Sequence, residues 1–583
     1  MDGRDPATNT DAGAHGVDNS VRRLGRRAFI AGTAGVIAGA TVLSGTANAV
    51  EPGASFFVPM SPTRLCDTRE RTGYKTVGTR TIRVRVAGRP GVPANAVAAV
   101  LTVTAVNRTQ GPIFVSTYPA ATIRPEASSL NCGRFDERIA NLVTVKLGAD
   151  GAIDIYSHGP AEIIVDLAGV YIPTAVPVGA GRFVSIGTAR RVLDTRKSGK
   201  IRPGGEVTVD LTKYVTPTAI AVVANLTAVE PNAQGFVTAY PANETRPGTS
   251  NLNPASGQNR AVGVMTKLGT VQTASGAVRG IKVFTQQGAH ILVDVIGYIT
   301  GPGDPATADG LFIPMAPRRL MDTRPVHQRL WPGWTKPIAI PSPASSRAQA
   351  VVLNLTATKT MGMGFYALVP TNTPRPEVST LNANWAGQTL ANHAIASVTP
   401  KGVSVYSHAG GHAVVDMNGW FTGTPMRTTT GPAVNPPPPG GPIPWVVQVP
   451  RLGLNQWVLD GDAKRVVDAG NSWHWTGTGL VGEGAHVVLF GHRTEHGGPY
   501  RYLHTLQNGD LLYITTSDSR RYTYRKVAEY LTSKYSSDIL AASRRVAGET
   551  VSLVACSRTD RLPTSLQYRL VSTFQLVGWE DLD

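Results

Sequence analysis

A long internal repeat dominates the chain. Between residues 50 and 424, one set of markers is written three times. The opening marker is FVPMSPTRLCDTR at 57–69, FVSIGTARRVLDTR at 183–196 and FIPMAPRRLMDTR at 312–324. Later markers recur in the same order, among them RPEASSLN, RPGTSNLN and RPEVSTLN. The repeat predicts three copies of one domain, which we call copy one (50–175), copy two (176–303) and copy three (304–424).

Each copy has the pattern of a β domain. Runs such as VAAVLTVTAV and AEIIVDLAGVY are rich in Val, Ile and Thr and are bounded by Gly, Pro and Asn. No amphipathic segment has the length of a helix. The pattern predicts three tandem β-sandwich or barrel-like units of about 120 residues each. The copies could also pack about one pseudo-threefold axis, and the sequence leaves this open.

The DTR triplet of each copy allows two interpretations. Its carboxylate and guanidinium could bind a ligand, or they could fix a turn. We favour the turn, because an identical triplet at the start of every copy is what a folding constraint produces. The triplet acids are Asp67, Asp194 and Asp322, beside Arg69, Arg196 and Arg324. The same interpretation applies to the acids near the last strand, Asp166, Asp294 and Asp416. The copies resemble repeats found in exported actinobacterial proteins, for which the resemblance implies only a wall-proximal role.

The chain has three cysteines, and two of them lie in copy one. Cys66 and Cys132 have no cysteine counterpart in the other copies. Their joint presence favours a disulfide over two free thiols, and an exported location would permit one. Cys556 is then left unpaired, which calls for a specific reason in an exported protein.

Residues 1–49 read as an export signal. Arg26 and Arg27 precede an apolar stretch, and a small-residue cleavage site follows at 47–49. The form RRAFI resembles the twin-arginine export signal. It predicts a protein of the cell surface, the cell wall or the medium, or one tethered to the membrane if the signal is retained. A short membrane anchor is the alternative, although Gly and Ala make the stretch weakly apolar for a span.

The net charge of +17 is concentrated in the copies. Residues 445–583 carry 15 Lys and Arg against 14 Asp and Glu, and residues 1–49 carry five against four, which leaves +15 for residues 50–444. Outside a cell, such a surface would attract anionic wall polymers or lipid headgroups. Nucleic acid is not expected as a partner, because no lysine-rich tract or nucleic-acid motif is present. A solvated basic surface without a partner is the simpler interpretation.

A proline-rich linker over 425–444 separates the copies from a different domain over 445–583. Its short strand-like runs predict a small β barrel or sandwich, with a short helix near 536–545. Cys556 ends the run VSLVAC, and a cysteine nucleophile needs a partner that handles protons. Of His474, His492, His496 and His504, His492 is best placed, since it ends the apolar run VVLFGHR. Arg569, in a later strand, could stabilise an oxyanion.

These residues carry a family resemblance. VPRLGL, the block GNSWHWTGTGLVGEGAHVVLFGHRTEHGGPYRYLHTLQNGD, SLVAC and YRLV together resemble a sortase, the cysteine transpeptidase of Gram-positive surfaces, most closely the actinobacterial classes D and E. The resemblance implies an eight-stranded β-barrel with Cys556 as nucleophile, His492 as general acid/base and Arg569 as the oxyanion and substrate-binding arginine. It implies cleavage of a Thr–Gly bond in an LPxTG- or LAxTG-like sorting signal of a surface protein, through a thioacyl enzyme, with transfer to an amine of the cell wall. No cofactor and no metal are expected. Two residues depart from the family pattern, Ala555 for a threonine and Ser552 for another.

Other classes were weighed against this interpretation. The chain could be a non-catalytic wall-binding or adhesive protein whose last domain keeps only the barrel, but retention of all three catalytic residue types argues against decay. An L,D-transpeptidase would show Ser-His-Gly-Cys around its nucleophile, which VACSR lacks. A papain-type protease is disfavoured because no cysteine opens a helix.

Overall fold

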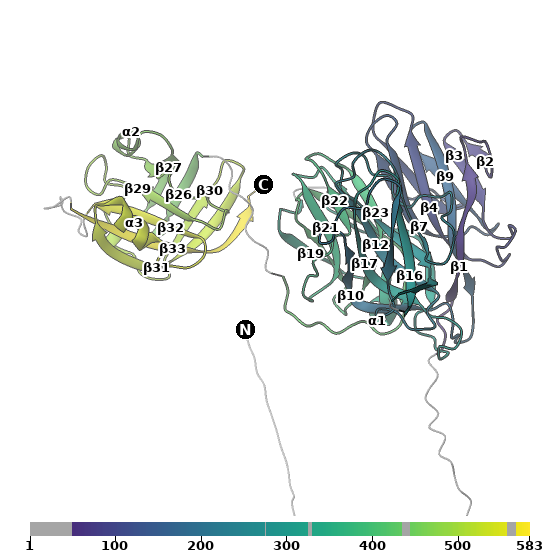
Figure 1. Cartoon of the computed structure of the whole chain (residues 1–583). Coiled ribbons are helices and arrows are strands. Elements are labelled where there is room, and N and C mark those ends of the chain that lie inside the picture. The colour runs from purple at the N-terminus through teal and green to yellow at the C-terminus, as the bar shows by residue number, and fades with distance from the viewer. Residues whose placement is uncertain (1–48, 275, 325–328, 434–442, 557–566, 583) are drawn as a thin grey trace, which may run out of the picture. The chain divides into compact units, whose positions relative to one another are not determined.

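The computed structural model describes residues 49–274, 276–324, 329–433, 443–556 and 567–582. The predicted signal over 1–49 lies outside these residues except for Ala49, and so do residues 434–442 of the linker. None of the described helices has the length and hydropathy that a membrane crossing requires. Strands are the main secondary structure of the described residues, as predicted, and helices are few and short (Figure 1).

Each copy contains an inner and an outer antiparallel sheet. In copy one the inner strands are β1 (Ser55–Asp67), β9 (Ala161–Pro173), β4 (Ala98–Asn107) and β7 (Arg138–Lys146), and the outer ones are β2 (Lys75–Gly78), β3 (Thr81–Arg85), β8 (Ala152–Ser157), β5 (Ile113–Pro119) and β6 (Leu130–Cys132). In copy two the inner strands are β10 (Phe183–Asp194), β17 (His290–Ile299), β12 (Ala221–Val229) and β14 (Arg260–Lys267), and the outer ones are β11 (Gly205–Asp210), β16 (Gly276–Thr285), β13 (Val237–Pro241) and β15 (Gly269–Thr273). In copy three the inner strands are β18 (Phe312–Asp322), β25 (His412–Thr422), β20 (Ala348–Thr358) and β23 (Leu390–Ser397), and the outer ones are β19 (Trp334–Ile338), β24 (Val403–Ser407), β21 (Gly364–Pro370) and β22 (Leu381–Ala383), with a short helix α1 (Ala344–Arg347).

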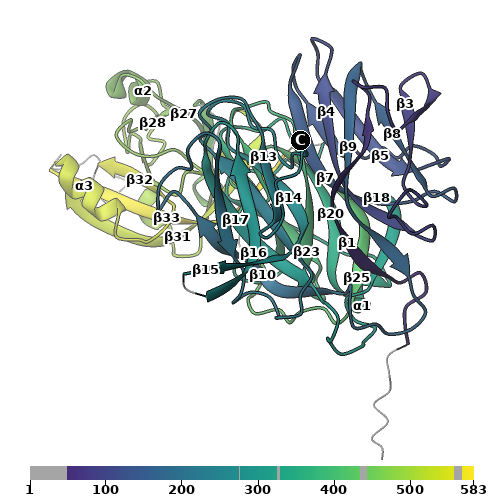
Figure 2. The same ribbon diagram turned by 45° about the vertical axis from the view of Figure 1, so that its right-hand side comes forward.

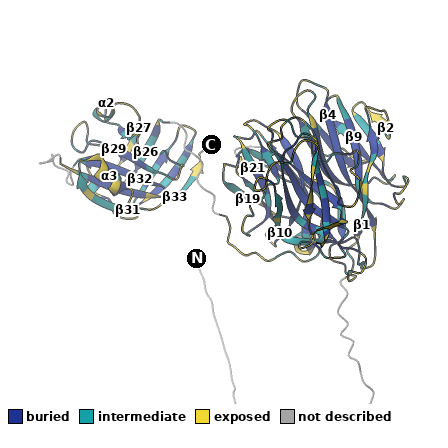
Figure 3. Ribbon diagram, viewed as in Figure 1, coloured by how far each residue is buried: buried dark blue, intermediate teal, exposed yellow. Residues whose placement is uncertain are grey.

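The central inner strands β4, β12 and β20 are buried on both faces (Figure 3). In β4, Leu101 and Val103 face the core of copy one, whereas Ala98 and Val100 face a second core that all three copies share. Two-sided burial explains why this strand reads as a continuous apolar run instead of an alternating one.

The shared core places the copies about a pseudo-threefold axis, which settles the arrangement that the sequence left open. Equivalent positions of the three copies meet in it, such as Phe57, Phe183 and Phe312. Tyr171 of copy one packs on Phe312 of copy three with ring centroids 4.4 Å apart. The edge strands β7, β14 and β23 contact one another, and the inner strands of the three copies lie together in Figure 2.

The DTR triplets stabilise turns through hydrogen bonds within the triplet, which confirms that they fix a turn. The Asp67 carboxylate accepts hydrogen bonds from the backbone N and the side chain of Arg69. Arg64 joins Asp67 to Asp166 on the last inner strand, at 2.9 and 2.5 Å. The same contacts recur in copies two and three, where the hydrogen bond from Arg196 lowers the pKa of Asp194 to about 2.

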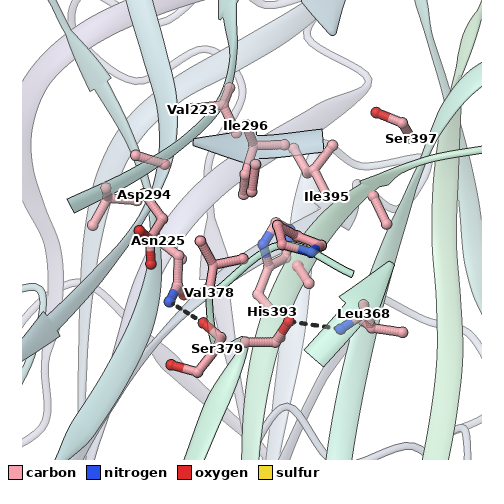
Figure 4. Close-up of a pocket in the computed structure, with 18 of the residues that line it drawn as sticks. Val223, Asn225, Asp294, Ile296, Leu368, Val378, Ser379, His393, Ile395 and Ser397 are labelled. Atoms are coloured by element: carbon pink, nitrogen blue, oxygen red, sulfur yellow. Dashed lines mark hydrogen bonds between the residues drawn. The ribbon is translucent and has the colours of Figure 1, made fainter. Parts of the chain in front are cut away.

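A small cavity lies where the inner sheets of the copies meet (Figure 4). His393 lines it, and burial lowers the pKa of this imidazole to about 3, so the ring is neutral. Its Nε2 lies 2.9 Å from Thr144 Oγ1 of copy one. The cavity volume of about 40 Å³ is far below the ~300–1,000 Å³ of a ligand pocket. The contact of His393 with Thr144 therefore joins copy three to copy one, and the cavity beside it offers no room for a substrate.

The predicted disulfide in copy one is absent, and Cys66 and Cys132 are both free and buried. Cys66 lies on β1 of the inner sheet and Cys132 on β6 of the outer sheet, and both pack as small apolar residues in the core of copy one. Burial raises the pKa of each thiol to about 12. Their joint presence in one copy reflects a shared apolar environment rather than a bond.

The last domain is a closed barrel of eight strands, as predicted. Around the barrel the strands are β26 (Trp445–Val449), β27 (Leu454–Leu459), β28 (Ser472–His474), β29 (His486–Phe490), β32 (Thr550–Cys556), β33 (Tyr568–Asp581), β31 (Arg520–Ser533) and β30 (Leu511–Thr515). Its helices are α2 (Ala463–Asp468) and α3 (Ser536–Ser543), with 3-10 turns at Pro450–Leu452 and Leu503–Thr505. The interior is filled by apolar side chains such as Trp445, Leu489 and Leu553. Helix α3, where a short helix was predicted, packs through Ile539 and Ala542 against the outer face of β29, β32 and β33.

We expect iodoacetamide to label one thiol of the native full-length protein at pH 8, that of Cys556. Cys66 and Cys132 are buried and remain protonated at this pH, which lies far below a pKa of about 12. Intact-mass analysis should show one adduct in native buffer and three in denaturant without reductant. If the denatured protein takes up only one label, Cys66 and Cys132 are joined by the disulfide that the sequence predicted.

We expect Phe312→Ala to lower the free energy of unfolding of the three-copy body by about 3–5 kcal/mol, because it opens a cavity in the shared core. The matched control is Ile123→Ala, whose side chain is 94% exposed and whose loss should change little. Chemical denaturation followed by far-UV circular dichroism measures both. Equal losses in the two variants would contradict a shared core.

Candidate active site

The register of three neighbouring strands aligns the predicted catalytic residues. Strand β29 runs parallel to β32 and pairs Phe490 with Val554. The amide of Gly491 continues this ladder by donating to the Val554 carbonyl at 3.2 Å. Two residues further along, His492 therefore comes level with Cys556. On the other side, β32 and β33 are antiparallel and pair Cys556 directly with Arg569. Side chains of such a pair lie about 5 Å apart at Cβ.

Strand alternation decides which face these side chains occupy. Leu553 and Ala555 of β32 lie in the barrel interior, and so does Leu570 of β33. Val554 and Val571 lie on the outer face under α3. Cys556 and Arg569 follow the outer-facing parity, two residues from these valines. The face beside α3 therefore carries the candidate site, and the methyl of Ala555 points away from it.

Cys556 is a free, half-buried thiol at the end of β32. The predicted loop that follows, residues 557–566, lies outside the described residues. Arg569 is half-buried as well, and its Nη1 donates to the carbonyl of Tyr568 at 3.0 Å. The thiol is thus accessible to a substrate, unlike the two thiols of copy one.

Packing explains why a glycine precedes His492. A Cβ on Gly491 would lie 2.9 Å from ring atoms of Tyr500, a fully buried side chain. The amide of Tyr500 donates to the His492 carbonyl at 3.0 Å, which closes the loop after β29. Arg493 is buried in this loop, with Nη2 2.6 Å from Nδ1 of His504. The GHR run therefore holds the His492 backbone through a glycine contact on one side and a buried arginine on the other.

The structure adds Asp468 to the site. Its Oδ1 accepts a hydrogen bond from His492 Nε2 at 2.8 Å. The carboxylate also pairs with Lys464 one helical turn earlier in α2. These two contacts, Lys464 first, lower the pKa of Asp468 to about 2. Sequence reasoning missed this residue because an acid at the end of the short run AKRVVD, 24 positions before His492, carries no motif.

The other three histidine candidates occupy different places. His474 is buried, with Nδ1 2.8 Å from Asp460 Oδ1 and Nε2 3.1 Å from the Gly479 carbonyl, so it supports the barrel. His504 is engaged by Arg493. His496 lies beside His492, with ring centroids 4.9 Å apart. Of the four, only His492 is level with Cys556.

Together, Cys556, His492 and Arg569 supply a nucleophile, a proton-transfer group and a cation on one face of the barrel. Asp468 accepts the hydrogen of His492 Nε2 and so favours the tautomer that leaves Nδ1 unprotonated. This set can attack a carbonyl carbon, stabilise the resulting oxyanion and protonate a leaving amine.

Residues 447–577 match the family model described as the sortase domain. A 92-residue stretch is 30% identical to sortase SrtE1 of Streptomyces coelicolor and covers 15% of this chain and 26% of that protein. This chain therefore spans about a quarter of the length of that curated relative.

Solved structures of sortases are also similar to this chain. A crystal structure of sortase E1 from Streptomyces coelicolor with a tripeptide in the active site is 23% identical, over 23% of this chain and 88% of that one, with a TM-score of 0.22. Sortase E from Streptomyces avermitilis is 23% identical, over 24% and 90%, with a TM-score of 0.20. Residues 447–577, which match the sortase domain, form most of the eight-stranded barrel.

Proposed function

We propose that the protein is an exported cysteine transpeptidase. It cleaves the Thr–Gly bond of an LPxTG- or LAxTG-like sorting signal and transfers the new carboxyl end to an amine of the cell wall. The observation that supports this is the strand register, which brings His492, Cys556 and Arg569 to one level on one face.

In the first half-reaction, the sulfur of Cys556 attacks the carbonyl carbon of the threonine. The thiol proton passes to His492, and the guanidinium of Arg569 stabilises the oxyanion. The C–N bond to glycine then breaks as His492 donates the proton to the leaving amine. The product is a thioester between Cys556 and the threonine.

In the second half-reaction, an amine attacks the thioester carbonyl. His492 removes a proton from the attacking nitrogen, and the C–S bond breaks. The thiolate of Cys556 recovers a proton from His492, so the enzyme returns to its starting state. Water in place of the amine gives hydrolysis by the same route.

Asp468 serves as a positioning residue for His492. Its carboxylate remains ionised at any pH well above about 2, so the 2.8 Å hydrogen bond to Nε2 persists across the working range. The bond holds the imidazole in one orientation and leaves Nδ1 to exchange the proton with Cys556 and the substrate.

The three copies would keep the enzyme at its substrate. Residues 50–444 carry a net +15, which suits anionic wall polymers, and export by the predicted signal would deliver the protein to the cell surface. The surface proteins that bear the sorting signal and the wall amine are then the partners. The alternative is a non-catalytic wall-binding protein, and the next experiment distinguishes it from the transpeptidase.

We expect the full-length protein to cleave LPxTG or LAxTG reporter peptides, and to form a transfer product when glycine or a diaminopimelate-type amine is added. Cys556→Ala should abolish both activities, and Arg569→Lys should reduce kcat/KM because a lysine lacks the planar donor fork. Chromatography with mass detection measures the products. Equal turnover by the protein and Cys556→Ala, or no turnover with either peptide and any amine, would favour the binding protein.

We expect Asp468→Asn to lower kcat roughly 10–100-fold, by analogy with other residues that orient a functional imidazole, while KM for the peptide changes little. Asp468→Glu should recover part of the rate. The matched control is Glu495→Gln, which removes an exposed negative charge from the loop after His492 and should leave kcat near that of the parent. A rise in KM with unchanged kcat would argue against a positioning role.

A further inference from the structure

A second cluster of chemical groups surrounds the proposed general base. Asp468, His492 and His496 each offer one ligand atom, and these three atoms lie within 4.8 Å of one another. Asp468 Oδ1 lies 2.8 Å from Nε2 of His492 and 3.6 Å from Nε2 of His496. Both imidazoles therefore present the same ring nitrogen to one carboxylate oxygen.

This donor set is one that divalent transition ions use. Two imidazole nitrogens and a carboxylate oxygen, with a remaining position for water, form a common open zinc site. Zinc bonds of about 2.0–2.1 Å to such atoms place tetrahedral ligands about 3.3 Å from one another. The two separations from Asp468 Oδ1, 2.8 and 3.6 Å, lie on either side of that value, and no two of the three ligand atoms are more than 4.8 Å apart, so side-chain rotations would bring them to it.

Charge and access also suit a cation. With its pKa lowered to about 2, Asp468 is ionised at neutral pH. The three side chains are 26%, 22% and 45% exposed in chain order, so an ion and its water can reach them. Lys464 holds the second carboxylate oxygen, Oδ2, and an entering ion would compete with its charge.

We propose that Asp468, His492 and His496 form a site for a divalent transition ion such as Zn²⁺, and that binding there switches the transpeptidase off. The switching part rests on the proposed function, whereas the binding part does not. Sequence analysis predicted no metal site here, because the ligands come from α2 and from the loop after β29 and meet only in the folded barrel.

Inhibition follows from which ring nitrogen of His492 carries the proton. To bind a metal through Nε2, the neutral ring must carry its proton on Nδ1. That nitrogen can then no longer accept the proton of Cys556, and the metal-bound ring cannot shuttle a proton to the leaving amine. Removal of the ion restores the hydrogen bond between Nε2 and Asp468, so inhibition is reversible.

Binding is tested first, with Co²⁺ as the spectroscopic probe and isothermal titration with Zn²⁺ as the second measurement. Full-length Cys556→Ala is the parent, so that no catalytic thiol contributes. We expect visible Co²⁺ bands and one-to-one binding, with the affinity lowered at least about tenfold by an added His496→Gln. Lys464→Gln should raise the affinity, and His158→Gln, a change of an exposed histidine in copy one, should not alter it.

Inhibition is tested next, in protein that keeps Cys556. We expect Zn²⁺ to stop peptide cleavage by the unsubstituted protein, EDTA to restore it, and His496→Gln in the Cys556 protein to stay active at the same Zn²⁺ concentration. Binding that survives His496→Gln, or no binding at all, would overturn the site. Equal inhibition of the unsubstituted protein and His496→Gln would overturn the switch. If no protein cleaves the peptides, the proposed function fails, while the Co²⁺ titration still decides the metal site.

Discussion

Strand β32 pairs with a parallel neighbour, β29, on one side and with an antiparallel neighbour, β33, on the other. The arrangement of the candidate site depends on these two pairings. Parallel pairing with β29 brings His492 level with Cys556, and antiparallel pairing with β33 puts Arg569 opposite it. A slip of one residue in either pairing would send a side chain to the opposite face of its strand. Val488, Val554 and Val571 pack together under α3, and this apolar cluster helps to hold the register of the three strands.

A second apolar constraint organises the rest of the chain. The three copies have a core each and share a further one, to which equivalent aromatic and aliphatic residues contribute. The polar residues repeated in each copy, such as Asp67 and Arg64, form ion pairs that hold strand ends together. The copies therefore form one body about a shared core, and residues 50–444 carry a net charge of +15.

Much of this was predictable from the sequence, for identifiable reasons. Strand patterns predicted an all-β chain, and the resemblance to sortases predicted the eight-stranded barrel; the roles of Cys556, His492 and Arg569 stay predictions. Asp468 was missed because its role depends on how α2 lies against the loop after β29, which no local pattern records. The disulfide between Cys66 and Cys132 was predicted wrongly, because two residues that occur together in one copy need not lie within bonding distance. The packing of the three copies about a shared core could not be predicted, because a strand that is buried on both faces differs in sequence only by a longer run of apolar residues.

The central claim is that Cys556 attacks a peptide carbonyl at the level set by the three strands. The most direct measurement is the intact mass of the full-length protein after brief incubation with a sorting-signal peptide at low pH, followed by peptide mapping. We expect a thioester adduct of the acyl half of the peptide, located on Cys556 and released by an added amine. An adduct on Cys66 or Cys132, or none on a folded protein that still binds the peptide, would contradict it.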